Sequence, residues 1–213
     1  MLDDYLPDNR PRPRKRPHQA RSHLTVEDIM EAAAHLLVEE EREALTTTRV
    51  AERAGVSVGT LYQYFSDLEE LVAKLVEVHL TRERDAMEAV LRDASSLSTA
   101  QLVNRLVDAF TSVFAIHPEL SAALYDELRR ASWGPTLDEL GQDTASVVAR
   151  ELQNRADEIA PSDPALAAFV LVSSIDSLVQ RAAAQRPEEL QSGIVAREAK
   201  QMARRYLLAG PDA

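Results

Sequence analysis

TTTRVAERAGVSVGTLYQYFSDLEEL, residues 46–71, holds two short helical patterns on either side of a tight corner at Gly55. Each pattern keeps its apolar residues on one face: Val50, Ala51 and Ala54 in the first, Leu61 and Phe65 in the second. Glycine follows a helix end at the least steric cost, because that position often takes a positive φ. The hydroxyls of residues 46–48 and of Ser57 suit the two helix starts as caps. Two helices joined by about three or four residues with a glycine predict a helix-turn-helix.

The composition of the whole chain predicts an all-α fold. Only six of 213 residues are glycine, and no proline lies between His18 and Ile116. Ala, Leu, Glu and Arg, all strong helix formers, fill the chain, and we find no convincing alternation of β-branched residues. A hydrophobic content of 45% is ample for a core.

The chain is expected in the cytoplasm, without a membrane partner. It has no run of about 18 apolar residues, and its N-terminus lacks the apolar stretch of a signal peptide. The absence of cysteine excludes disulfides, thiolate nucleophiles and cysteine-based zinc sites, and it fits a reducing compartment.

Charge is distributed unevenly. The net charge is −11, yet residues 1–24 hold six basic and three acidic side chains, and all three acids precede Arg10. A proline-rich basic segment buries little apolar surface, so we predict a disordered basic arm over residues 1–23. Beside a helix-turn-helix the arm can order along phosphates. Its candidate contacts are Arg14, Lys15, Arg16 and Arg21. The alternative is a solubilising tail.

The sequence contains no catalytic constellation. The five histidines are scattered, and HExxH, GxSxG and glycine-rich phosphate loops are all missing. Paired acids are abundant, but on faces predicted to be solvated. We therefore predict no enzyme activity, no cofactor and no metal site.

Apolar stripes and capping residues predict further helices. Four helix starts carry capping residues: Thr25 with Asp28, Ser66 with Glu69, Ser98 with Gln101, and Asp163 before Pro164. The first helix is thus expected to begin at Thr25. After a turn at residues 133–135, a seventh helix is expected over 137–159, and the last over 187–209.

Residues 14–71 resemble the N-terminal DNA-binding domain of the TetR family of transcriptional regulators. The likeness is carried by QARSHLTVEDIMEAA, ALTTTRVAERAGVS and GTLYQYF. The resemblance implies a three-helix DNA-binding head over residues 24–66, with a long fourth helix as connector. It further implies that residues 67–213 form a helical domain that dimerises and binds a small effector.

By family position, contacts with double-stranded DNA come from the second helix and the recognition helix. The matching residues are Thr47, Thr48, Ser57, Val58, Gly59, Thr60, Tyr62, Gln63 and Tyr64. Hydroxyls suit phosphate oxygens, and Gln63 can pair with adenine. Tyr62 and Tyr64 point about 200° apart on a helix. We expect Tyr62 to anchor a phosphate and Tyr64 to act near the helix end, with simple packing of both rings as the alternative.

Two positions depart from the family pattern. Glu41 stands where glycine usually ends the first helix, and Leu68 stands where a phosphate-contacting lysine is usual. Between Thr25 and Phe65 there are eight acids and only three arginines. Affinity for DNA should therefore depend on the basic arm.

The family places an effector pocket among the helices that carry most of the body's aromatic residues. The pocket candidates are Phe110, Phe114, His117, Tyr125 and Trp133. An apolar lining suits a lipophilic ligand, although core packing also explains an aromatic stripe.

The eighth and last helices are expected to form a four-helix dimer interface, with burial inside one chain as the alternative. The interface candidates are Phe169, Val172, Ser173, Met202 and Tyr206.

The expected function is that of a homodimeric, sequence-specific DNA-binding regulator. We predict a repressor that binds a palindromic operator and is released by a small lipophilic effector. The alternative is a helical ligand carrier or adaptor with a weak or vestigial DNA-binding head, for which the acidic head and Leu68 are the best support.

Overall fold

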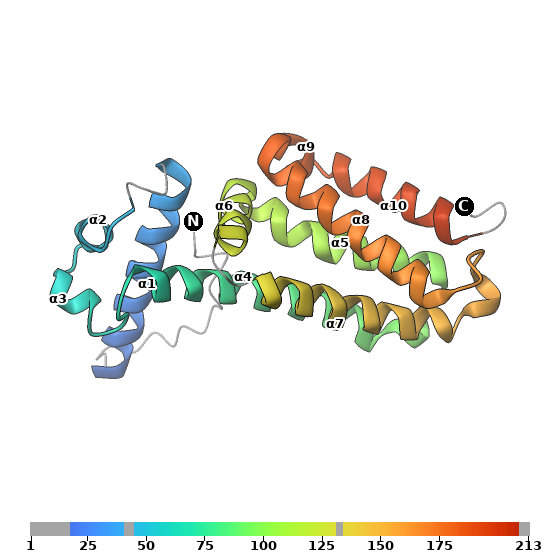
Figure 1. Cartoon of the computed structure of the whole chain (residues 1–213), viewed down its shortest axis with the longest axis horizontal. Coiled ribbons are helices and arrows are strands. Elements are labelled where there is room, and N and C mark those ends of the chain that lie inside the picture. The colour runs from blue at the N-terminus through green and yellow to red at the C-terminus, as the bar shows by residue number, and fades with distance from the viewer. Residues whose placement is uncertain (1–17, 41–44, 131–133, 209–213) are drawn as a thin grey trace. The chain divides into compact units, whose positions relative to one another are not determined.

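The structure, a computed structural model, describes residues 18–40, 45–130 and 134–208. All secondary structure in these ranges is helical (Figure 1), which confirms the all-α prediction. The chain divides into two compact units, Met1–Thr81 and Arg82–Ala213. Each unit is described separately below.

The first unit holds α1 (His18–Glu39), α2 (Thr47–Arg53), α3 (Val58–Leu61) and the start of α4 (Leu68–Arg92). Both predicted hydroxyl caps are confirmed. Thr46 Oγ1 accepts a hydrogen bond from Arg49 N at 3.3 Å, and Ser57 Oγ accepts one from Thr60 N at 3.0 Å. Gly55 has a φ of 68°, the left-handed conformation expected after α2.

The apolar stripes predicted for this unit are buried. Their most deeply buried members are Ile29, Ala33, Leu36, Val50, Ala51, Leu61, Phe65, Leu71 and Leu75. Burial of a large apolar side chain stabilises the fold by about 1.5–3 kcal/mol. Because α2 packs against both α1 and α3, this burial fixes the two short helices on either side of Gly55.

Two predicted helix starts in this unit were wrong. α1 begins at His18, so Thr25 lies inside the helix and does not cap it; no proline or glycine interrupts the residues between them. At α4 the capping pair lies one residue later than Ser66 with Glu69. Asp67 Oδ1 accepts from Glu70 N at 2.8 Å, and Glu70 Oε2 accepts from Ser66 N at 2.6 Å.

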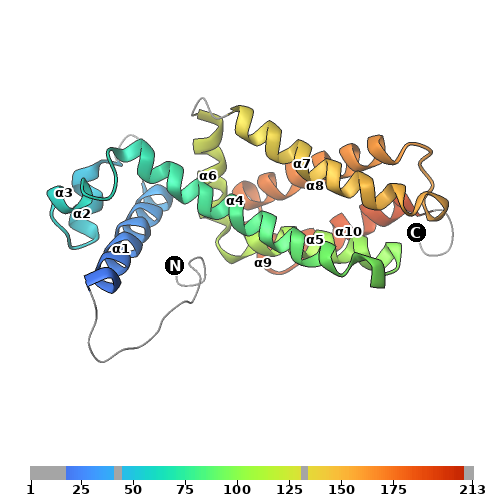
Figure 2. The same cartoon turned by 90° about the horizontal axis from the view of Figure 1, so that it is seen from below.

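The second unit holds the rest of α4 and six further helices. These are α5 (Thr99–Ile116), α6 (Pro118–Arg130), α7 (Gly134–Gln153), α8 (Pro164–Gln185), α9 (Pro187–Gln191) and α10 (Ile194–Leu207). Figure 2 shows α4 as one uninterrupted helix. The predicted caps are confirmed at Ser98, which forms a full capping box with Gln101, and at Asp163, which precedes Pro164.

α8 is the central helix of the second unit, because it packs against α5, α6, α7 and α10. The buried core around it consists of Val103, Val107, Val148, Leu152, Ala167, Ala168, Leu171, Ala199, Ala203 and Leu207. Polar contacts also connect outer parts of this unit to one another. Lys200 Nζ lies 2.7 Å from Asp108 Oδ1, and the Arg155 guanidinium donates to the carbonyl oxygens of Ala94 and Leu97.

The last predicted helix is in fact two. α9 ends at Gln191, and Gly193, with a φ of 76°, turns the chain before α10 begins. Glycine adopts this left-handed conformation without the penalty that a Cβ brings. Likewise, α7 ends at Gln153, and a separate 3-10 turn at Ala156–Glu158 precedes Ile159. α7 also begins inside the turn expected at residues 133–135.

By length and composition, α8 qualifies as a candidate membrane span, although the sequence contains no run of about 18 apolar residues. Core helices of soluble proteins pass the same test. Only 28% of its most apolar window is buried, so much of this helix is available for contact with another surface.

Candidate nucleic-acid interface and effector core

Two hydroxyl groups predicted to meet phosphate lie side by side in the first unit. Thr47, in the first turn of α2, places Oγ1 3.3 Å from the hydroxyl oxygen of Tyr62, the residue after α3. The Tyr62 side chain is 51% exposed, whereas large aromatic rings without an external partner are usually buried. The exposed pair joins α2 to α3 and leaves both hydroxyls within reach of a ligand.

The start of α3 presents small and polar groups. Ser57 Oγ lies 2.8 Å from Thr60 Oγ1 in addition to capping the helix. Gly59 is exposed, and a Cβ built on it would meet only Ser57 Oγ, at 3.8 Å, an ordinary contact. Among the residues that the structure describes, no close contact requires glycine at this position. Its lack of a side chain allows another surface to approach α3 closely.

The two tyrosines of the recognition segment differ in exposure. Tyr62 and Gln63 are exposed, and Tyr64 is half-buried. The regular α3 is only Val58–Leu61, and Gln63 N and Tyr64 N donate to carbonyl oxygens three residues back, so the helix tightens before Phe65. Tyr64 is thus better placed for packing than Tyr62 is. Direct contact of these residues with DNA stays a prediction.

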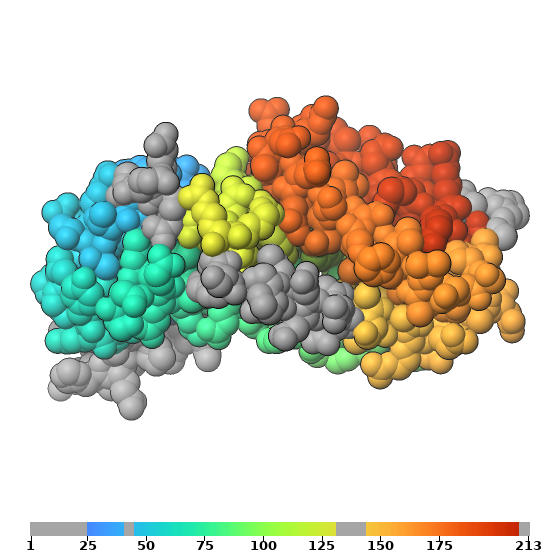
Figure 3. All heavy atoms as spheres, viewed as in Figure 1, coloured from blue at the N-terminus to red at the C-terminus, as the bar shows by residue number. Residues whose placement is uncertain are grey.

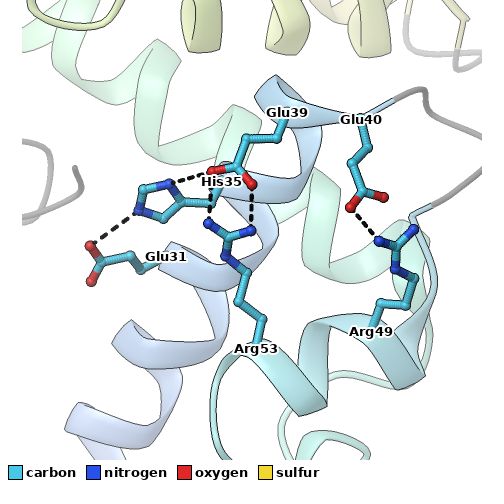
Figure 4. Close-up of polar contacts among 6 residues, drawn as sticks. All are labelled: Glu31, His35, Glu39, Glu40, Arg49 and Arg53. Carbon is cyan, nitrogen blue, oxygen red and sulfur yellow. Dashed lines mark hydrogen bonds and ion pairs between the residues drawn. The ribbon is translucent and has the colours of Figure 1, made fainter.

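The arginines of α2 point toward the C-terminal end of α1 (Figure 4). Arg53 makes a two-pronged ion pair with Glu39, with N···O distances of 2.5 and 2.7 Å, and Arg49 pairs with Glu40. The hydrogen bonds from Arg53 hold the pKa of the Glu39 carboxyl below its usual value. His35 lies between Glu31 and Glu39 at 3.7 and 3.6 Å. In this arrangement, α2 directs both arginines at acids of its own unit.

The basic arm, predicted to be disordered over residues 1–23, falls largely outside the described residues, but the prediction was wrong for residues 18–23, which form the start of α1. Arg14, Lys15 and Arg16 lie outside them, and Arg21 lies on α1, with its side chain outside the description. Their role as phosphate contacts therefore stays a prediction.

Three of the five pocket candidates come together in the second unit. The rings of Phe110 and Phe114 have centroids 5.1 Å apart, and those of Phe114 and Tyr125 are 5.4 Å apart. Phe114 is fully buried, so the rings fill the space between α5 and α6. His117 is half-buried at the end of α5, and Trp133 lies outside the described residues. The three rings therefore pack against one another in this unit.

A buried carboxylate holds the hydroxyl of Tyr125. This hydroxyl lies 3.0 and 2.9 Å from the two carboxylate oxygens of Glu83, which α4 supplies. Burial and the Glu83 charge together raise the pKa of Tyr125 well above its ordinary value. Burial, with a contribution from Glu83, also raises the pKa of Asp176 to about 6. Gln180 Nε2 donates to Asp176 Oδ2 at 2.8 Å, and Gln180 Oε1 accepts from Arg129 at 3.2 Å.

The five dimer candidates on α8 and α10 differ in exposure, and Val172 and Tyr206 also pack against the core of the unit. Phe169 is 60% exposed and Met202 40% exposed; Ser173 is exposed, and Val172 and Tyr206 are half-buried. α8 also exposes two further apolar residues, Leu166 and Val170. In Figure 3 the atoms of α8 to α10, coloured orange to red, form a continuous surface on the visible face of this unit.

The polar residues that anchor both candidate sites were not predicted from the sequence: Glu39, Glu40, Arg49, Arg53, Glu83 and Asp176. A signal existed for Glu83, because it continues the buried α4 stripe that contains Val72, Val76 and His79. A carboxylate on such a stripe needs a partner. Among the described residues, no group of three or more His, Cys, Asp or Glu is arranged to hold a metal ion.

Comparison with known proteins agrees with this architecture. Residues 29–75 match the family model described as bacterial regulatory proteins of the tetR family. Residues 98–207 match the family model of the tetracyclin repressor-like C-terminal domain. The second match alone covers half of the chain.

Individual relatives show the same relationship. The chain is 30% identical over 142 residues to the HTH-type transcriptional regulator BetI of Cronobacter sakazakii, covering 65% of this chain and 69% of BetI. It shares its fold with NalD, the secondary repressor of the MexAB-OprM multidrug efflux pump in Pseudomonas aeruginosa. That likeness has a TM-score of 0.69 and 17% identity, over 87% of this chain and 98% of NalD. The fold of SmeT, solved in complex with triclosan, matches with a TM-score of 0.65 and 19% identity, over 89% and 94% of the two chains. With both of its parts matched, the chain belongs to the TetR family of DNA-binding transcriptional regulators.

Proposed function

We propose that this TetR-family regulator is a repressor that binds a palindromic operator as a homodimer and leaves it when a small lipophilic effector enters the body. The family is non-enzymatic. We further propose a functional division into an arm (1–23), a DNA-binding head (24–66) and an effector-binding and dimerisation body (67–213), working in the cytoplasm.

The exposed Thr47–Tyr62 pair is the observation that carries the DNA-binding part of this proposal. Two helices each contribute a hydroxyl at the same exposed spot, and hydroxyls of this kind commonly bind phosphate oxygens and fix register on a duplex. Exposed Gln63 and Gly59 lie beside them, where an amide and a bare backbone suit contact with base edges. Phosphate contacts would position the head, and base contacts would select the operator.

The aromatic cluster supports an effector site in the body. The cluster combines the apolar rings of Phe110, Phe114 and Tyr125 with one polar group, the Tyr125 hydroxyl. Small-molecule sites commonly have this composition. SmeT, which shares this fold, binds triclosan in its solved complex, and a lipophilic effector for this chain is proposed by analogy. Glu83 comes from α4, the helix that continues into the first unit. An effector that displaced the Tyr125 ring would disturb α4 and so change the spacing of the two heads, which makes DNA and effector binding mutually opposed.

The homodimer is supported by the exposed apolar residues of α8 and α10. α8 exposes the apolar side chains of Leu166, Phe169 and Val170. An apolar patch of this kind is unfavourable in water and often marks a contact with another protein surface. Two-fold symmetry is the most common arrangement of homo-oligomers, and it presents two recognition helices to two half-sites.

The alternative, a ligand carrier with a vestigial head, rests on the acidity of the head. The internal pairing of Arg49 and Arg53 with acids at and just after the end of α1 adds to its support, because arginines so engaged neutralise fewer phosphates. Under the repressor proposal, the basic arm supplies the missing charge.

Titration of duplex DNA from the chain's own upstream region, at two salt concentrations, separates the two candidates. The repressor proposal predicts tight binding that weakens steeply with salt and is lost in Tyr62→Ala. A lack of binding to every duplex tested would favour the ligand-carrier alternative. Binding unchanged by the substitution would show that the arm acts without the recognition helix.

A further inference from the structure

The outward face of α1 is acidic. Glu27, Asp28, Glu31, His35 and Glu39 are spaced so that they lie along one side of the helix. Figure 4 shows the last three of them on this side. The opposite side of α1 is buried in the core of the first unit. Four carboxylates therefore share one exposed strip of the head.

Asp28 is the member of this face that most favours an added cation. Among the described residues, none lies within hydrogen-bonding or ion-pairing distance of its carboxylate. Partial burial, with a contribution from the charge of Glu31, raises the pKa of Asp28 above its ordinary value. A nearby cation would offset both the lost hydration and the repulsion from Glu31.

The acidic face is hollowed where it meets α2. An open depression of about 270 Å³ is lined by Asp28, Glu31, Ala32, His35, Arg53 and Ala54. The one arginine in this lining is already engaged, because Arg53 donates to both carboxylate oxygens of Glu39 at 2.5 and 2.7 Å. The depression thus keeps an excess of negative charge and has room for a guanidinium group.

The segment just before α1 has the opposite charge and a sufficient length. Residues 10–16 read RPRPRKR, with five basic side chains and no acid. Alternating prolines favour an extended chain of about 3.1 Å per residue, so this segment spans about 19 Å. Asp28 and Glu31 lie about 15 and 20 Å along α1 from its first residue, His18. An arm that turned back along α1 would bring its basic side chains over the depression.

We propose that the basic arm docks on the acidic face of α1 in its own chain, with Arg10 and Arg12 at Asp28 and Glu31, and is displaced by DNA phosphates. The head then carries its own competitor for phosphate. Duplexes that offer only phosphates bind weakly, whereas an operator also supplies base contacts and displaces the arm. The docking stands apart from the proposed function, and its effect on DNA affinity rests on that function.

Paramagnetic broadening of NMR signals tests the docking without DNA. The chain has no native cysteine, so Asn9→Cys in the full-length protein carries a nitroxide label at a single site beside Arg10. At about 0.01 M salt the label should broaden the backbone amide signals around Asp28 and Glu31. The broadening should be lost at about 1 M salt, which screens exposed charges. It should also be lost in the double variant Asp28→Asn, Glu31→Gln.

Glu52→Gln with Glu77→Gln is the matched control, because it removes the same charge from two other exposed acids of the first unit. The control should keep the broadening. Mixing nitroxide-labelled chains with isotopically enriched, unlabelled chains shows whether an arm reaches the head of another copy. Broadening in that mixture, an equal loss in the control, or no broadening in wild type would each overturn docking within one chain.

Affinity for duplex DNA of random sequence, measured by fluorescence anisotropy, tests the competition. Asp28→Asn with Glu31→Gln should raise this affinity about two- to tenfold, as expected for the loss of two exposed ion pairs that hold the arm. In a chain that also carries Arg10→Gln and Arg12→Gln, most of the gain should vanish. An equal gain in both backgrounds would overturn the competition, because it would show only reduced repulsion between the head and DNA. Absence of binding to any duplex would overturn the proposed function and leave the docking result intact.

Discussion

Thr47 and Tyr62, fifteen residues apart in sequence, place their hydroxyl oxygens 3.3 Å from each other on the exposed side of the first unit. The contact ties the first turn of α2 to the end of α3 across the corner at Gly55. Under the proposed function the two hydroxyls would share one anionic partner, because a phosphate oxygen can accept from two adjacent hydroxyls. The sequence assigns the two residues to separate helices, and the structure brings their hydroxyls together.

Removal of the Tyr62 hydroxyl should weaken DNA binding without changing its salt dependence. Tyr62→Phe loses about 1 kcal/mol of hydrogen bonding, roughly a fivefold loss of affinity, and Tyr62→Ala should lose more. Thr47→Val should cause a similar loss, and the double variant should lose less than the sum, because the two groups share one partner. Fluorescence anisotropy at two salt concentrations gives both quantities. Full additivity of the two losses would show that the hydroxyls act independently.

The basic arm should set the salt dependence. Alanine at Arg14, Lys15, Arg16 and Arg21 should flatten the plot of log affinity against log salt by about 0.9 for each phosphate that the arm no longer neutralises. Arg186→Ala is the control, since Arg186 is an exposed arginine of the second unit that pairs with Glu189. An arm variant with the wild-type slope would identify the arm as a solubilising tail.

Loss of the Tyr125 hydroxyl should destabilise the second unit. Tyr125→Phe removes this hydrogen bond to the buried Glu83 carboxylate, and a hydrogen bond to a charged group contributes about 1.5–3 kcal/mol. Tyr206→Phe, on the half-buried side of α10, is the matched control and should change stability by less than about 0.5 kcal/mol. Urea unfolding measures both variants. Equal stability of the two would show that Glu83 is satisfied by other groups.

Asp176 should make stability depend on pH between about 4 and 6. Its pKa is about 6 in the folded chain against an ordinary value of 3.8, so the folded state binds this proton more tightly than the unfolded state. The associated stability is present at low pH and is lost as pH rises through about 6. Asp176→Asn keeps an acceptor for Gln180 but cannot ionise. The free energy of unfolding of the variant, minus that of wild type, should therefore increase as pH rises from about 4 to 7, by about 3 kcal/mol at most. A difference independent of pH would contradict the raised pKa.

Local signals predicted much of the fold because the interactions behind them span few residues. The caps at Thr46, Ser57, Ser98 and Asp163 are each formed with an amide two or three residues away. The same locality explains the error at α4. Ser66 with Glu69 and Asp67 with Glu70 both fit a capping pattern, and only the folded geometry chooses between them.

The polar contacts that define the candidate sites were beyond the sequence. Arg53 meets Glu39 across 14 positions, and Tyr125 meets Glu83 across 42. Periodicity predicts which face of a helix is buried, but not which residue of another helix it meets. The assignment of Thr47 and Tyr62 to a DNA contact came from a family resemblance, and their proximity to each other came only from the structure.

Selection of duplexes from a random library by the full-length chain, in parallel with its Tyr62→Ala variant, tests the central claim most directly. A dimer that presents two recognition helices should enrich a palindromic sequence whose half-site centres lie about one helical turn, or a multiple of it, apart. The Tyr62→Ala variant should enrich that sequence weakly or not at all. No enriched sequence, or an equal enrichment by the variant, would contradict the account of this chain as an operator-binding regulator that acts through α3.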